Sequence, residues 1–204
     1  MLALFVSLVA PMPNDELPYL VPLEYAPWDF QCTRDAQQGF FRDRAVNDQT
    51  QDISRSFLAY VDSTLVGYLT LAMDAIELKR KERPSSDIPY PRLPAVKLCQ
   101  LAVHKDHERR GLGKKLVALA AGSALELKQR VGCRYLTVDA AEPWLVEWYA
   151  MQEFKVNKID EAEKQTRAAK AGVDPATYTT SMRLDLHSLL LDLHDRFPRD
   201  FRDE

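Results

Sequence analysis

The chain has 204 residues, of which 46% are hydrophobic and 28% are charged, and its formal net charge is −3. This length and composition suit one globular domain, or one domain with appendages. The three cysteines are far apart and form no CxxC pair, and the four histidines show no metal-ligand spacing, so we expect neither a disulfide framework nor a metal site.

Residues 2–10 are almost wholly apolar. This run is too short to span a bilayer, and it lacks the basic segment that opens a signal peptide. We interpret it as a first strand, a dimer contact or the product of a mis-assigned start codon. We therefore expect a cytoplasmic protein that does not associate with a membrane.

The next segments alternate between strands and one helix. Tyr19–Leu23 is expected to form a short strand. Thr33 is a candidate N-cap for a helix over residues 34–46. Residues 56–61 and 65–72 read as two strands of a hairpin. One face of the expected helix carries its apolar side chains, which are Ala36, Phe40, Phe41 and Ala45.

Residues 79–94 form a charged loop with four prolines, and long loops inside a domain are often functional. A strand over residues 95–103 follows, and after a glycine turn a helix is expected to run to about Val131, with Gly132 ending it. The apolar stripe of that helix consists of Leu116, Val117, Ala120, Ala124, Leu127 and Val131.

The remaining elements are expected to be a strand over 135–140, a helix over 143–151, a strand over 154–157, a polar helix over 160–171 and a strand over 179–186. Residues 187–204 are expected to form an amphipathic C-terminal helix that packs on the domain or on a partner. Strands mixed with few crossover helices predict an α+β or α/β fold around a central mixed sheet flanked by helices.

The most informative segment is LCQLAVHKDHERRGLGKKLV, which starts at Leu98. A strand, a glycine turn and a helix present backbone N–H groups to a phosphate, and Gly111 and Gly113 allow close approach. The spacing fits neither a P-loop nor a Rossmann turn. The segment is therefore interpreted as a pyrophosphate site, and the alternative is a strand–helix turn whose glycines serve geometry alone.

Charge is unevenly distributed. Between Lys79 and Lys115 there are eleven basic and four acidic residues, a local net charge of +7, which leaves −10 for the rest of the chain. A basic centre in an acidic protein favours a local anionic ligand over a long nucleic-acid track. The alternative is a solvated charged face.

With this order of elements, the chain resembles the GNAT superfamily of acetyl-CoA-dependent N-acetyltransferases. Three segments carry the resemblance: LAVHKDHERRGLGKKL, YLTVDAAEPWLVEWYAMQEF, and an upstream stretch from FQCTRDAQQGFF to VGYLTL. The upstream stretch is similar to a branch that includes bacterial toxins acetylating aminoacyl-tRNA. The matches cover about Phe30–Phe154 and imply a single GNAT-like domain over residues 1–204, with its core at about 18–186.

The resemblance implies site residues position by position. The backbone of the fourth strand would bind the pantetheine arm through Leu101, Ala102 and Val103. The pyrophosphate would lie on the turn formed by Arg109, Arg110, Gly111, Leu112, Gly113 and Lys114. Tyr149 falls on the family's tyrosine and would protonate the coenzyme A thiolate as a general acid. The alternative for Tyr149 is a core aromatic of an amphipathic helix.

Some positions depart from the family pattern. Glu108 occupies a position where the family has Arg or Gln, and a carboxylate there is unfavourable for a pyrophosphate unless it points away or is paired. No general base is evident. Asp139 is a weak candidate for that role, and a loop cap is its favoured interpretation.

The resemblance therefore implies an N-acetyltransferase that uses acetyl-CoA as co-substrate, without a metal. The acceptor is expected to be either a small-molecule or peptide primary amine or the amino group of an aminoacyl-tRNA. Net acidity favours the former, since affinity for RNA comes mainly from phosphate contacts. A non-catalytic acyl-CoA-binding regulatory module is a further alternative. A homodimer through the apolar ends is as compatible with the sequence as their packing on their own domain.

Overall fold

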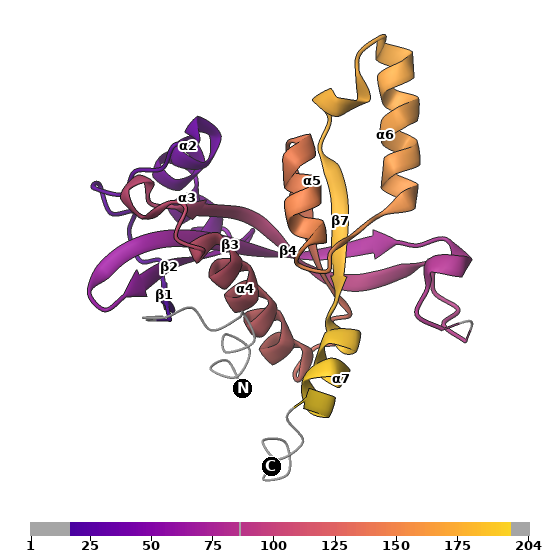
Figure 1. Ribbon diagram of the computed structural model, residues 1–204, viewed down its shortest axis with the longest axis horizontal. Helices are drawn as coiled ribbons and strands as arrows, with labels where there is room; N and C mark the ends of the chain where they lie inside the picture. Colours follow the sequence, from indigo (N-terminus) through magenta and orange to yellow (C-terminus); the bar gives the residue numbers. More distant parts are fainter. Residues whose placement is uncertain (1–16, 86, 197–204) are drawn as a thin grey trace. The chain divides into compact units, whose positions relative to one another are not determined.

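The computed structural model describes residues 17–85 and 87–196. Its strands form one mixed seven-stranded sheet in the order β1-β2-β3-β4-β5-β7-β6, flanked by helices (Figure 1), which confirms the expected fold class. The strands are β1 (Tyr19–Pro22), β2 (Arg55–Val61), β3 (Thr64–Glu77), β4 (Arg92–Val103), β5 (Tyr135–Ala140), β6 (Lys155–Val156) and β7 (Thr180–Asp185). The helices are α2 (Asp35–Asp43), α3 (Ala45–Thr50), α4 (Leu112–Lys128), α5 (Pro143–Ala150), α6 (Lys158–Ala171) and α7 (Leu186–Arg196).

The described residues form two compact units, and strands β3 and β4 contribute to both. The first unit comprises the described part of Met1–Met73 together with Leu98–Glu126. The second comprises the described parts of Asp74–Lys97 and Leu127–Glu204. The apolar run at residues 2–10 and residues 197–204 of the expected C-terminal helix lie outside the described residues. None of the described helices is long and apolar enough to cross a membrane.

The core of the first unit is aromatic. The ring of Phe41 lies 4.7 Å from that of Phe30 and 4.6 Å from that of Tyr68, between ring centroids. Leu23, Ala45, Leu58 and Ala102 complete this buried cluster. Helix α2 therefore contributes one large buried side chain, Phe41, to the core beneath β2 and β3.

The helix expected over residues 34–46 is two helices. Arg44 has non-helical backbone angles, with φ −126°, and separates α2 from α3. This break turns Ala45 and Asp48 of α3 inward, whereas Ala36 is exposed. Thr33 is not the cap, because the N-cap position is Arg34 and it makes no side-chain capping bond.

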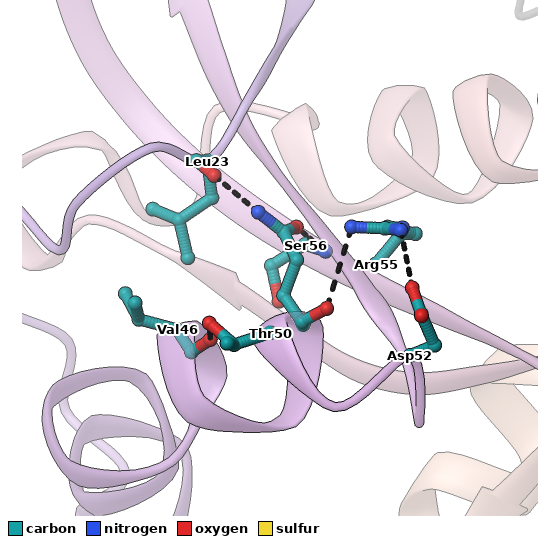
Figure 2. Close-up of polar contacts among 7 residues, drawn as sticks. Leu23, Val46, Thr50, Asp52, Arg55 and Ser56 are labelled. Atoms are coloured by element: carbon teal, nitrogen blue, oxygen red, sulfur yellow. Dashed lines mark hydrogen bonds and ion pairs between the residues drawn. The ribbon is translucent and has the colours of Figure 1, made fainter.

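The end of α3 is fastened to the sheet by Gln49. Its amide nitrogen donates to the carbonyl oxygen of Leu23, and its amide oxygen accepts from the backbone N–H of Ser56 at 3.1 Å. Figure 2 shows Leu23 with the hydrogen bond to its carbonyl oxygen, Ser56 close by, and the ion pair between Arg55 and Asp52. One side chain thus joins the residue after β1 to the start of β2.

The second unit is built on β7. Strand β7 pairs antiparallel with β5 over its whole length, from Tyr135↔Asp185 to Ala140↔Thr180, and with β6 on its other side. Helix α6 runs alongside β7 (Figure 1). A second core cluster, of Ile76, Leu78, Leu93, Ala95 and Tyr135, lies where β3, β4 and β5 meet.

Several boundaries differ from the sequence expectation. Helix α4 ends at Lys128, and Val131 is 54% exposed, because the N–H groups of Arg130 and Val131 both bond the carbonyl of Leu127 in a closing turn. Strand β4 begins at Arg92 and β3 extends to Glu77, so the expected loop is shorter than 79–94 at its far end and contains a turn of 3-10 helix at Arg80–Glu82.

Candidate active site

The glycine turn lies in the first unit, between the end of β4 and the start of α4. Arg109 has φ 62° and Gly111 has φ 77°, so two nearby residues are left-handed. Such a conformation is strained for arginine and ordinary for glycine. Left-handed turns gather backbone N–H groups on one side, and the N-terminus of the 17-residue helix α4 adds its own N–H groups and positive dipole end. This geometry is of the kind that can bind an anion.

The cations of the turn face solvent, with one exception. Arg109, Arg110 and Lys114 are exposed, whereas Lys115 is buried with 6% of its surface accessible. Leu112 is buried and anchors the first turn of α4, and Gly113 is half-buried. Three side chains and the backbone around Gly111 thus remain available to a phosphate.

Glu108, the unfavourable carboxylate, has a hydrogen-bond partner. The hydroxyl of Thr33 donates to its Oε1 at 2.7 Å. Lys105, three residues before Glu108, donates to the amide oxygen of Gln31, and the backbone N–H of His104 donates to the carbonyl of Val66. The start of the turn is thereby tied to residues 31–33 and to β3.

The strand segment expected to bind pantetheine also lies in the first unit. Ala102 is buried, and Leu101 and Val103 are half-buried. A Cβ atom on Gly67 of β3 would lie 2.6 Å from the carbonyl oxygen of Ala102 and 3.0 Å from Cδ1 of Leu116. The backbone of β4 therefore approaches β3 more closely here than any residue but glycine allows.

Tyr149 lies in the second unit, on α5. The residue is 8% exposed, and its ring contacts Trp148 and Phe154, with ring centroids 4.9 and 5.3 Å away. Its hydroxyl forms no hydrogen bond with any described residue. Burial raises the pKa of Tyr149 to about 12. The phenol is thus kept in its protonated form, which a proton donor requires.

The second unit also contains a cavity of about 480 Å³. Its walls come from β3, β4, β5, α6 and the segment before β7. Inside it, Lys97 of β4 pairs with Asp139 of β5, with 2.5 Å between Nζ and Oδ2, and Asp74 accepts a hydrogen bond from Thr137 at 2.6 Å. Asp139 is therefore an ion-pair partner and not an isolated base.

The sequence did not predict this cavity, because its lining residues come from segments far apart in the chain. The one sequence feature that pointed to this cavity is the polar character of the helix expected over 160–171, because Glu163, Lys164 and Arg167 line the cavity. Among the described residues, no group of three or more His, Cys, Asp or Glu side chains is arranged to hold a metal ion.

A seven-stranded mixed sheet with a glycine turn opening α4 is the architecture of an acyl-CoA-dependent acyltransferase. The model of the acetyltransferase (GNAT) family matches residues 17–154, so the chain belongs to that family. It is an acetyl-CoA-dependent N-acetyltransferase, as its sequence segments implied.

A relative and two solved structures refine the comparison. The tRNA-acetylating toxin of Mycobacterium tuberculosis (strain ATCC 25618 / H37Rv) is 28% identical over 122 residues, which are 59% of this chain and 73% of the relative. AtaT complexed with acetyl-methionyl-tRNAfMet is 22% identical, with a TM-score of 0.65 over 85% of this chain and 98% of that one. A mutant AtaT toxin bound to the C-terminus of the antitoxin AtaR and acetyl-CoA is 20% identical, with a TM-score of 0.63 over 87% and 98%. The two structures share this fold.

Proposed function

We propose that the protein acetylates the α-amino group of an aminoacyl-tRNA. The observation that carries this proposal is the similarity to a tRNA-acetylating toxin over most of that relative's length. In the sequence, the net negative charge favours a small-molecule or peptide amine as the acetyl acceptor. That argument weakens because the cations are concentrated between Lys79 and Lys115, and a basic region can bind RNA on a protein whose net charge is negative.

The proposed role of the turn is to bind the pyrophosphate of acetyl-CoA. Backbone N–H groups around Gly111 and the start of α4 donate to the phosphate oxygens, and Arg109, Arg110 and Lys114 neutralise their charge. The backbone of Leu101, Ala102 and Val103 bonds the pantetheine arm. Holding the thioester against a strand places its carbonyl carbon in a fixed position for attack.

The proposed chemistry is direct transfer. The amine nitrogen attacks the thioester carbonyl carbon, the carbon–sulfur bond then breaks, and the thiolate takes the proton of the Tyr149 hydroxyl. The amine gives up a proton to water as the amide forms, and a proton from solvent then restores the hydroxyl of Tyr149. An α-amino group has a pKa of about 7.7–8, so an appreciable fraction is uncharged near neutral pH without a dedicated base. This agrees with an Asp139 that is already paired with Lys97.

Two measurements in sequence test the proposal. Calorimetric titration with acetyl-CoA should give micromolar affinity that is lost in Gly111→Glu, because φ 77° and the added carboxylate both oppose the phosphate. Gly132→Glu is the matched control, since a side chain there meets nothing within 4 Å.

The second measurement follows radiolabelled acetyl from acetyl-CoA into a mixture of aminoacyl-tRNAs and, in parallel, into free amino acids, polyamines and short peptides. Label that precipitates with aminoacylated tRNA and not with deacylated tRNA is the expected result. Transfer to free amines alone would contradict the tRNA proposal, and no binding of acetyl-CoA by the folded wild type would contradict the whole mechanism.

A further inference from the structure

A groove of about 380 Å³ lies on the second unit, between the loop that follows β3 and helix α6. The family match covers residues 17–154 and so does not include α6. The groove is lined by Lys79, Ile159, Ala162, Glu163, Thr166, Arg167 and Lys170.

The groove carries an excess of positive charge. Lys79, Arg167 and Lys170 line it against a single carboxylate, that of Glu163. All three cations are exposed, and none of them forms an ion pair or a side-chain hydrogen bond with a described residue. Arg167 instead lies over the ring of Tyr178, with 5.4 Å from its guanidinium carbon to the ring centroid. The cations are thus available to an anionic partner.

Both walls of the groove are rigid. On the loop side, the carboxylate of Glu82 is buried against Arg183, and Arg83 donates to the carbonyls of Leu78 and Ile88. On the helix side, Lys164 donates to the hydroxyl of Thr180 at 2.6 Å. Because contacts on each side hold the neighbouring backbone, the cations project from fixed backbone positions. A binding site with fixed positions loses less entropy when its partner binds.

The groove leads inward to the cavity that contains Lys97 and Asp139. Ile159, Glu163 and Arg167 line both hollows. Asp139 stands near the end of β5, and helix α5, which carries Tyr149, begins shortly after that strand at Pro143. A chain lying along the groove and into the cavity would therefore reach β5, the strand that precedes the helix with the proposed acid.

We propose that this groove binds the phosphodiester backbone of the tRNA substrate near its aminoacylated end, which the inner cavity receives. The proposal rests on the function proposed above. Closely spaced cations on a fixed surface are what phosphate recognition requires, and they contribute affinity without base specificity. Two of the seven lining residues, Ile159 and Ala162, are apolar, and this favours RNA over a folded protein partner, whose interfaces need more apolar side chains.

The test uses the full chain and fluorescently labelled, deacylated bulk bacterial tRNA. Anisotropy titrations at several salt concentrations compare the wild type with Lys79→Gln/Lys170→Gln, which leaves the stacked Arg167 in place. Loss of two phosphate contacts should make the negative slope of log K against log salt shallower by about 1.4–1.8. It should also weaken binding about 10- to 30-fold near 0.15 M salt. The control, Arg130→Gln/Lys155→Gln, removes two exposed cations outside the groove and should change neither.

Three further readouts separate the outcomes. Affinity for acetyl-CoA should be unchanged in Lys79→Gln/Lys170→Gln, and acetylation of aminoacyl-tRNA should show a raised KM with an unchanged kcat. Equal salt slopes for wild type and groove variant would overturn the proposal even where aminoacyl-tRNA is acetylated. No binding of tRNA by the wild type would overturn it too, as would a groove variant that retains tRNA but loses affinity for a poly-glutamate peptide. If only free amines are acetylated while the slope still falls, the groove proposal stands and the proposed function does not.

Discussion

The guanidinium of Arg183 in β7 lies 3.2 Å from the carboxylate of Glu82, 101 residues earlier in the chain, and the side chains are only 9% and 6% exposed. Arg183 also donates to the backbone of Val156 and to the side chain of Asn157, at 3.0 and 2.8 Å. One buried arginine thus fixes the loop that carries Lys79 to the strand at the centre of the second unit.

Removing Glu82 should therefore be costly. Glu82→Ala leaves Arg183 buried without its counter-ion, and breaking such a pair destabilises a protein by about 3–5 kcal/mol. The measurement is the free energy of unfolding in urea. Arg55→Ala is the matched control, because its ion pair with Asp52 is exposed, and it should cost about 1 kcal/mol or less. Equal losses in the two variants would show that the buried pair does not hold the loop.

Short-range patterns in the sequence predicted much of this fold. Tyr135–Ala140 was expected as a strand and forms one with the same bounds, because its unbroken apolar run is buried between neighbours in the sheet. The hairpin around Asp62 and Ser63 follows from two alternating runs separated by a tight turn. In both cases, residues close in sequence carry the whole signal.

The features that the sequence did not predict depend on partners distant in the chain. No local pattern marks Arg44 as a helix break, since arginine is a good helix former and the break accompanies burial of Ala45 and Asp48 against distant parts of the chain. Likewise, the partners of Glu82 and Glu108 are 101 and 75 residues away. The turn that opens α4 could be recognised from the sequence because its glycines directly precede the apolar pattern of the helix. The cavity beside α6 could not, because its lining residues come together only in the folded chain.

Gly67 should be intolerant of any side chain. Gly67→Ala places a Cβ 2.6 Å from the carbonyl oxygen of Ala102, which the backbone of β4 must move to avoid. Since Ala102 belongs to the segment proposed to bind pantetheine, we expect both lower stability, by about 1–3 kcal/mol, and weaker acetyl-CoA binding. Thermal unfolding and calorimetry measure the two effects.

Gly39→Ala is the control for this substitution. Gly39 lies within α2, and a Cβ there meets nothing within 4 Å. Alanine at a helical glycine should raise stability by about 0.5–1 kcal/mol and leave acetyl-CoA affinity unchanged. If Gly67→Ala behaved like Gly39→Ala, the close approach of β3 to β4 would have no functional importance.

The hydrogen bond between Thr33 and Glu108 predicts that a second substitution can rescue the loss of acetyl-CoA affinity caused by a first. Thr33→Val removes the hydroxyl that holds the Glu108 carboxylate, which is then free to approach the phosphate site. Acetyl-CoA affinity should fall about fivefold, the equivalent of about 1 kcal/mol for one hydrogen bond. Adding Glu108→Gln should restore it, because the released group is then uncharged.

Thr50→Val is the control, since its hydroxyl bonds only the carbonyl of Val46 within α3. It should not alter acetyl-CoA affinity. If Thr33→Val loses affinity and Glu108→Gln does not restore it, the loss comes from distortion of the turn. That result would contradict the idea that the released Glu108 carboxylate repels the phosphate.

Tyr149→Phe tests the proposed acid. The variant keeps the ring that packs against Trp148 and Phe154, so the fold and acetyl-CoA affinity should be retained. Loss of the proton donor should lower kcat about 10²- to 10⁴-fold. Tyr90→Phe, at a side chain that is 67% exposed, is the control and should leave kcat unchanged. A Tyr149→Phe enzyme with wild-type kcat would reduce Tyr149 to a core aromatic.

The raised pKa of Tyr149 adds a pH dependence whose sign is fixed. Burial raises it to about 12, above the ordinary value near 10. The acid therefore stays protonated, and kcat should show no alkaline loss between pH 8 and pH 10. The phenol's contribution to folding stability is fully present below pH 10 and is lost as the pH rises toward 12, since only the unfolded chain ionises readily in that window. Unfolding free energies of wild type and Tyr149→Phe should therefore converge on one pH profile below pH 10 and separate above it, with the wild type losing more.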